Sequence, residues 1–213
     1  MTMKNIQYKR SHGRMMVSMM IAIVFSLTGA HVASAATASD TATVNLTVGS
    51  TISITSPSDV TMGAITATGQ SALTTNSATW NVKTNNSAGY SLAWQSSAAS
   101  MTSGADTVAA YTPASAGVSE VWSVAGTDSE WGAHLGSTST SVNTATWGSA
   151  DTYGAGKWMN VNNAAPFTVA TRSTETSGAG DDEIIYFGAE VGASKLQPTG
   201  TYTVDVTMTA TTL

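Results

Sequence analysis

The chain has 213 residues, of which 10% are charged, and it contains no cysteine. This composition excludes disulfide frameworks, thiolate metal sites and cysteine nucleophiles, and nothing in it suggests a nucleic-acid-binding protein. The length suits one domain or two small ones.

The first 35 residues predict a secretory signal peptide. Four basic residues lie within the first 14 positions, and a 13-residue, mostly apolar segment follows from Met15 to Leu27. The small residues Ala33-Ser34-Ala35 then match the pattern that signal peptidase reads, so cleavage is expected after Ala35. An uncleaved anchor is disfavoured because spanning a bilayer takes roughly 20 apolar residues. We therefore expect a secreted, extracellular protein with no transmembrane segment in its mature chain.

Signal removal would make the chain strongly acidic. Four basic residues would remain against all thirteen acidic ones, a net charge of −9. Such a charge excludes nucleic-acid binding through counterion release and disfavours anionic lipid surfaces. Its simplest consequence is solubility at a crowded surface.

The mature region predicts β-structure throughout. Its 178 residues include 33 threonines and 24 serines, and threonine favours strands because it is β-branched. Apolar and polar residues alternate, the pattern of a half-buried strand, and no helical periodicity competes with it. In chain order, this alternation predicts strands at 41–48, 52–55, 79–83, 90–95, 167–171, 185–191 and 201–210.

Each predicted strand has one apolar face, which a second sheet must cover. Turn-forming sequences such as Asn85-Asn86-Ser87-Ala88-Gly89 separate the strands. About nine to eleven short strands predict an all-β fold, an antiparallel β-sandwich of the immunoglobulin-like or jelly-roll type. We expect one such domain over residues 36–213, with 96–118 and 136–156 as long loops. The expected core contains Trp80, Leu92, Trp94, Phe187, Val204 and Val206.

Three consecutive acidic residues form the densest charge cluster. Asp181, Asp182 and Glu183 follow a glycine-rich turn and precede a predicted strand. Calcium prefers oxygen ligands on flexible loops, so these residues are weak candidates for a calcium site. The spacing does not match an EF-hand loop, and solvated turn carboxylates are the simpler interpretation.

Aromatic residues near the predicted loops are candidate glycan contacts. Trp131, Trp147 and Tyr153 lie in or beside these loops, and exposed aromatic rings stack on sugars. The alternative is that these rings anchor loops or the core. His134 is the only histidine of the mature chain, and no G-x-S-x-G turn accompanies it, so we interpret it as structural. We expect neither an active site nor a cofactor.

Four segments carry a resemblance to a known group of proteins. They are Val60–Ile65, Trp80–Leu92, Glu183–Val191 and Pro198–Ala210. Together they resemble uncharacterised secreted surface β-sandwich proteins of candidate-phylum bacteria, and more distantly WxL-type cell-wall-binding domains. The resemblance implies a β-sandwich and peptidoglycan binding. Both W-x-L motifs are altered, to Gly89-Tyr90-Ser91-Leu92 and to Thr207-Met208-Thr209-Ala210.

Three classes of function follow. The first is a structural or adhesive cell-surface protein, such as a subunit of a pilus-like fibre or surface coat. The second is a glycan- or cell-wall-binding module, and the third and least favoured is a secreted enzyme. The expected partners are further copies of the chain or a cell-surface glycan or protein. For self-association, the strand predicted at 41–48 could join its own sheet or a neighbour's open edge.

Overall fold

The computed structural model describes residues 36–66, 72–161 and 163–213. The predicted signal peptide, residues 1–35, lies outside the described residues. The chain divides into two units, Met1–Thr47 and Val48–Leu213. The described part of the first unit, residues 36–47, is exposed and contains neither helix nor strand. The second unit contains all the described secondary structure.

The second unit is built almost entirely of β-strands, as the alternation predicts. Its described helix, α2 (Thr144–Trp147), is a single turn that Asn143 caps by accepting a hydrogen bond from the Ala145 amide. The described strands are β1 (Ile52–Thr55), β2 (Ala72–Thr84), β3 (Tyr90–Ser96), β4 (Met101–Ser103), β5 (Asp106–Ala110), β6 (Glu120–Val121), β7 (Ser129–Leu135), β8 (Lys157–Trp158), β9 (Phe167–Arg172), β10 (Asp181–Val191) and β11 (Val206–Thr212).

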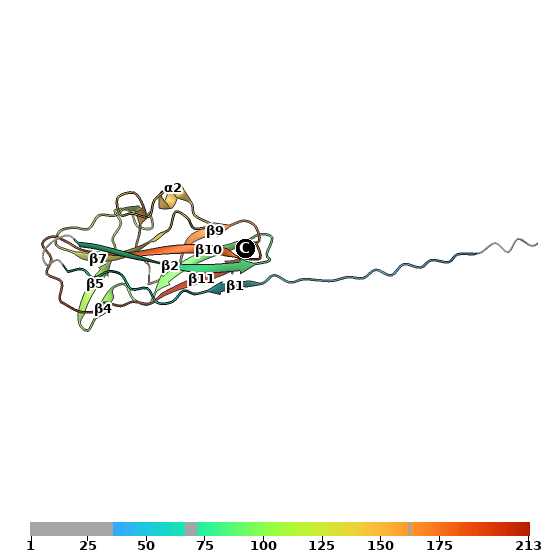
Figure 1. The fold of residues 1–213 in the computed structure, drawn as a ribbon, viewed down its shortest axis with the longest axis horizontal. Helices are drawn as coiled ribbons and strands as arrows, with labels where there is room; N and C mark the ends of the chain where they lie inside the picture. The colour runs from blue at the N-terminus through green and yellow to red at the C-terminus, as the bar shows by residue number, and fades with distance from the viewer. Residues whose placement is uncertain (1–35, 67–71, 162) are drawn as a thin grey trace, which may run out of the picture. The chain divides into compact units, whose positions relative to one another are not determined.

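The strands form three sheets. The largest has the order β1-β2-β10-β7-β5-β4, the second β11-β3-β9, and β6 pairs with β8 alone. The long strands β2 and β10 run side by side through the largest sheet (Figure 1). All pairs of described strands are antiparallel except β5 with β7, which are parallel, so the expectation of a wholly antiparallel structure is wrong at this pair.

The inward faces of the six-stranded and three-stranded sheets share one hydrophobic core. In β3, the side chains of Tyr90, Leu92 and Trp94 are buried in strict alternation. Trp80 and Phe187 come from the other sheet and meet edge to face, with ring centroids 6.4 Å apart. The predicted core residues therefore cluster as expected, although Val204 and Val206 at its margin are only half-buried.

A second core covers the opposite face of the six-stranded sheet. Here an aromatic cluster is formed by Tyr111, Trp122, Tyr153 and Trp158. The rings of Tyr111 and Trp122 stack at 4.5 Å, and those of Tyr153 and Trp158 stack at 4.7 Å. Segments 96–118 and 136–156, predicted as loops, therefore contain β4, β5 and α2 and supply two rings of this cluster.

Two paired glycines make room for the aromatic cluster. Gly132 in β7 lies directly opposite Gly188 in β10. A Cβ at Gly188 would meet the Tyr153 ring at 2.8 Å and Trp158 Cζ3 at 2.9 Å, while one at Gly132 would meet Trp122 Cζ3 at 3.1 Å. Because neither glycine has a side chain, the rings can pack directly against the backbone of β7 and β10.

Gly188→Ala should therefore destabilise the protein. The added methyl group must displace packed rings, which costs about 1–3 kcal/mol of the free energy of unfolding. Gly154→Ala is the matched control, because a Cβ there meets no atom within 4 Å. Chemical denaturation measures the stability of both variants. Equal stabilities would contradict the conclusion that the aromatic rings need the space that Gly188 leaves.

The strand predicted at 41–48 is absent. Residues 36–50 contain no strand, and the exposed fractions of Val44, Leu46 and Val48 are 92%, 88% and 74%. The last strand also starts later than predicted, at Val206, after an isolated bridge between Thr102 and Thr203. Alternation shows which side chains could share a face, but a strand also needs a neighbouring backbone to pair with.

Candidate functional site

The three consecutive acidic residues begin β10 and point to different faces of the sheet. Asp181 and Glu183 are buried with exposed fractions of 3% and 0%, on the face that also carries their paired neighbours Val82 and Trp80. Asp182 lies on the other face, where its carboxylate accepts a hydrogen bond from Asn81 Nδ2 at 2.8 Å. The period-two geometry of a strand therefore separates the three carboxylates.

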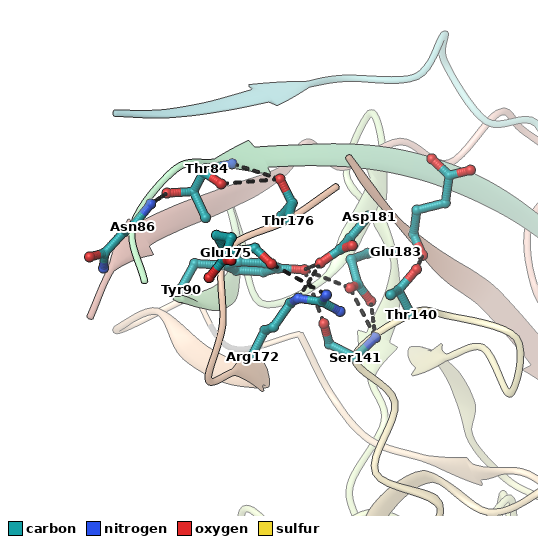
Figure 2. Close-up of polar contacts among 11 residues, drawn as sticks. Thr84, Asn86, Tyr90, Thr140, Ser141, Arg172, Glu175, Thr176, Asp181 and Glu183 are labelled. Carbon is teal, nitrogen blue, oxygen red and sulfur yellow. Dashed lines mark hydrogen bonds and ion pairs between the residues drawn. The ribbon is translucent and has the colours of Figure 1, made fainter. Parts of the chain in front are cut away.

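The two inward carboxylates belong to a buried polar cluster of Tyr90, Ser141, Arg172, Asp181 and Glu183 (Figure 2). The Tyr90 hydroxyl lies 2.8 Å from Glu183 Oε1 and 3.2 Å from Asp181 Oδ2. The Ser141 amide donates to Glu183 Oε1 at 3.1 Å, and its hydroxyl lies 3.0 Å from the Tyr90 hydroxyl. Arg172 Nε forms an ion pair with Asp181 Oδ2 at 3.1 Å.

Tight turns bring these residues together. Gly89, with a φ of 83°, ends the turn before β3 and places Tyr90 as the first residue of that strand. A Cβ at Gly89 would overlap the Arg172 carbonyl, so only glycine allows this close approach. The turn between β9 and β10 is tied to the end of β2, where Thr176 donates its amide to the Thr84 carbonyl at 3.1 Å. The end of β2, the start of β3, the end of β9 and the turn before β10 therefore lie close together.

Burial governs the electrostatics of the polar cluster. It raises the pKa of Glu183 above the usual range, although the hydrogen bonds from Ser141 and Tyr90 oppose this shift. Burial also raises the pKa of Tyr90, and the neighbouring Glu183 carboxylate raises it further. Both side chains are fully enclosed, with exposed fractions of 0%. The hydrogen bonds of these two enclosed side chains join β3 to β10.

Glu183→Gln should change how stability depends on pH. Because the pKa of Glu183 is raised by folding, the native state holds its proton more tightly, and this stabilisation is lost as pH rises from the unfolded pKa through the folded one. The amide keeps the shape of the neutral acid but does not titrate. The variant should therefore gain stability relative to wild type above about pH 4.3, by up to about 1.4 kcal/mol per pH unit.

Urea denaturation at several pH values between 4 and 8 measures this difference. Glu175→Gln controls for the loss of one carboxylate, because Glu175 is exposed on the turn before β10. A stability difference between wild type and Glu183→Gln that stays constant over this range would contradict the assignment.

The three acidic residues proposed as calcium ligands do not point toward one common position. Asp182 points away from Asp181 and Glu183, and both inward carboxylates already have protein partners. Within the described part of the chain, no three His, Asp or Glu side chains converge as metal ligands.

A shallow, open hollow of about 550 Å³ lies near the polar cluster, at the ends of β1 and β2. Its lining includes Ile52 and Thr84, together with the turn before β10. Its charged lining residues are one base, Lys83, and one acid, Glu175. Apart from Ile52, the remaining lining consists of small, hydroxyl and amide residues, a surface with few features for binding a ligand tightly.

Two of the three candidate glycan contacts are buried and not exposed to a ligand. Trp131 and Trp147 each have an exposed fraction of only 1%. Trp131 lies in β7 within the shared core, and Trp147 ends α2, where its Nε1 donates to the Val169 carbonyl at 3.0 Å. Tyr153 is half-buried, with its ring stacked on Trp158. The burial of both tryptophans agrees with the alternative interpretation, that these rings anchor the core or its loops.

His134 is buried in β7 and has two acceptors. Its Nδ1 lies 2.9 Å from the Lys157 carbonyl oxygen, and its Nε2 lies 3.1 Å from Asp151 Oδ1. Ser137 contacts the same carboxylate through its amide and its hydroxyl. These hydrogen bonds lower the pKa of Asp151, outweighing the effect of its burial. Ser137 therefore bonds to the carboxylate and not to the imidazole, which is not the order of a nucleophilic triad.

Sequence reasoning missed Tyr90, Ser141 and Arg172 as partners of the acidic residues. One signal was available, since Asp181 and Glu183 keep the phase of Ile185 and Phe187 and so share their inward face. No protein family model matches the sequence, and no curated protein matches it either. In the described part of the chain, no helix has the length and apolar character needed to cross a membrane.

Proposed function

We propose that this chain is a secreted structural or adhesive protein of the cell surface, which self-associates as a subunit of a pilus-like fibre or a surface coat. In this proposal residues 1–35 direct export and are removed. The six-stranded and three-stranded sheets then form the two halves of a β-sandwich of the immunoglobulin-like or jelly-roll type.

The exposed alternating segment 41–48 carries this proposal. Three large aliphatic side chains, Val44, Leu46 and Val48, are 74–92% exposed on it. They recur at every second residue, so they share one face whenever the segment is extended. Contiguous exposed apolar surface of this kind marks a site of interaction. A protein that carries such a segment ahead of its first described strand is equipped to associate with another surface.

The construction of the folded unit supports a structural role. It has no disulfide, so its rigidity must come from packing and hydrogen bonding. Two cores on opposite faces of one sheet, and a buried polar cluster that joins β3, β9 and β10, provide that rigidity. In this proposal, the buried carboxylates of Asp181 and Glu183 contribute to rigidity and have no catalytic role.

The test is to express residues 1–213 in a bacterium with an active secretory pathway and to examine the exported protein. N-terminal sequencing should begin at Ala36, and negative-stain microscopy should show filaments or sheets. The acidic net charge opposes self-association, so assembly should increase as salt screens it above about 0.15 M. Sedimentation at low and high salt measures this dependence.

Protein that stays monomeric at every salt and protein concentration would contradict the fibre or coat proposal. Retention of such a monomer on purified cell-wall glycan would favour the glycan-binding alternative instead.

A further inference from the structure

We propose that residues 41–48 of one copy bind as an added β-strand along the free edge of β11 in a second copy. The inference rests on the proposed self-association and names the two surfaces that meet. It also explains why a segment with the pattern of a strand contains no strand within its own chain.

The donor segment, residues 41–48, has the sequence pattern of a strand that still lacks a partner. Ala42, Val44, Leu46 and Val48 alternate with Thr41, Thr43, Asn45 and Thr47. The segment contains no charged residue, no proline and no glycine, and the described backbone groups of 41–48 form no hydrogen bond to another backbone. Extended peptides of this kind bind by adding to an open sheet edge, where main-chain hydrogen bonds supply affinity and alternate side chains supply specificity.

The outer edge of β11 is an unprotected acceptor. β11 is the end strand of its sheet, paired with β3 on one side and with no described strand on the other. Its seven residues contain no charge, no proline and no bulge, the devices that normally protect an edge. Its length of seven residues also matches the eight-residue donor segment.

The other sheet edges are less suitable. The edge of β4 already pairs with Thr203, through two backbone hydrogen bonds of 3.0 Å with Thr102. On β9, the carbonyl of Val169 accepts a hydrogen bond from the Trp147 ring, and the pairing of β9 with β3 is irregular at Leu92. β1 has only four residues, and Pro57 follows soon after it. Among the described strands at the ends of sheets, β11 therefore has the longest regular edge.

The two faces of the proposed strand pair match. Along β11, Val206 and Ala210 are half-buried on the core face, and β1 lies close by with its half-buried Ile52 and Ile54. The aliphatic face of the donor would complete the burial of these side chains. On the outer face, the threonines of the donor would lie beside Thr207, Thr209 and Thr211, all exposed, and cross-strand threonine pairs are favourable.

The first experiment compares two variants of the exported protein that carry the same added charge. Val44→Asp with Leu46→Asp places the charges on the aliphatic face, and Thr43→Asp with Asn45→Asp places them on the polar face. All four residues lie outside the folded unit, so both variants should keep the wild-type melting temperature. Sedimentation should show that the first variant loses assembly and the second retains it. Equal assembly, or equal loss, would overturn the proposal.

The second experiment identifies the acceptor edge by disulfide crosslinking, which is clean because the chain has no cysteine. Protein carrying Asn45→Cys is mixed with protein carrying Thr209→Cys, oxidised, and analysed by mass spectrometry of the linked peptides. A matched mixture replaces Thr209→Cys with Thr168→Cys, an exposed position on β9 at the opposite edge of the same sheet. The proposal expects at least a tenfold excess of the 45–209 link over the 45–168 link.

The outcomes separate this inference from the proposed function. Filaments without an excess of the 45–209 link would overturn strand donation to β11 and leave the fibre proposal standing. A strong 45–209 link in short oligomers, with no filament or sheet under any condition, would support strand donation and overturn the fibre or coat proposal. Monomers without that link would overturn both.

Discussion

The fold depends on one strand, β10, because other parts of the protein pack against both of its faces. Ile185, Phe187 and Ala189 pack into the core shared by the two sheets. On the opposite face, Gly188 supports the aromatic cluster, and Glu190 accepts a hydrogen bond from Trp122 Nε1 at 2.6 Å. Because neighbouring residues of a strand face opposite ways, residues Ile185 to Glu190 alternate between the two cores. A shift of one residue in register would move each set to the opposite face, where the packing is built for the other set.

The same strand explains why acidic residues lie inside this protein. Asp181 and Glu183 occupy inward positions at the start of β10, where the adjacent residues of β2 are Val82 and Trp80. Carboxylates at such positions are costly unless they are paired and hydrogen-bonded. Tyr90, Ser141 and Arg172 supply these partners from three other segments. The polar cluster therefore ties β10 to β3 and β9 at the end of the core.

Prediction from sequence succeeded where the relevant information is local. The alternation of Tyr90, Leu92 and Trp94 identifies their shared face, and the structure places all three in the core. It failed where the outcome depends on distant partners. Trp147 is buried because it packs edge to face on Trp94, with ring centroids 5.4 Å apart, and no local pattern indicates that contact. Segment 41–48 shows the reverse case, since its pattern is that of a strand but no described strand of its own chain pairs with it.

In the proposed assembly, segment 41–48 becomes a strand only when a second copy supplies a partner, whereas the strands from β1 onward are already paired in the monomer. Amide hydrogen exchange followed residue by residue tests this claim most directly. In the monomer, the amides of β10 should be protected while those of 41–48 exchange as rapidly as in an unstructured peptide. After assembly, the amides of 41–48 and of β11 should both slow by about tenfold or more, because each gains main-chain hydrogen bonds. Exchange at 41–48 that is already slow in the monomer, or that does not change on assembly, would contradict the account.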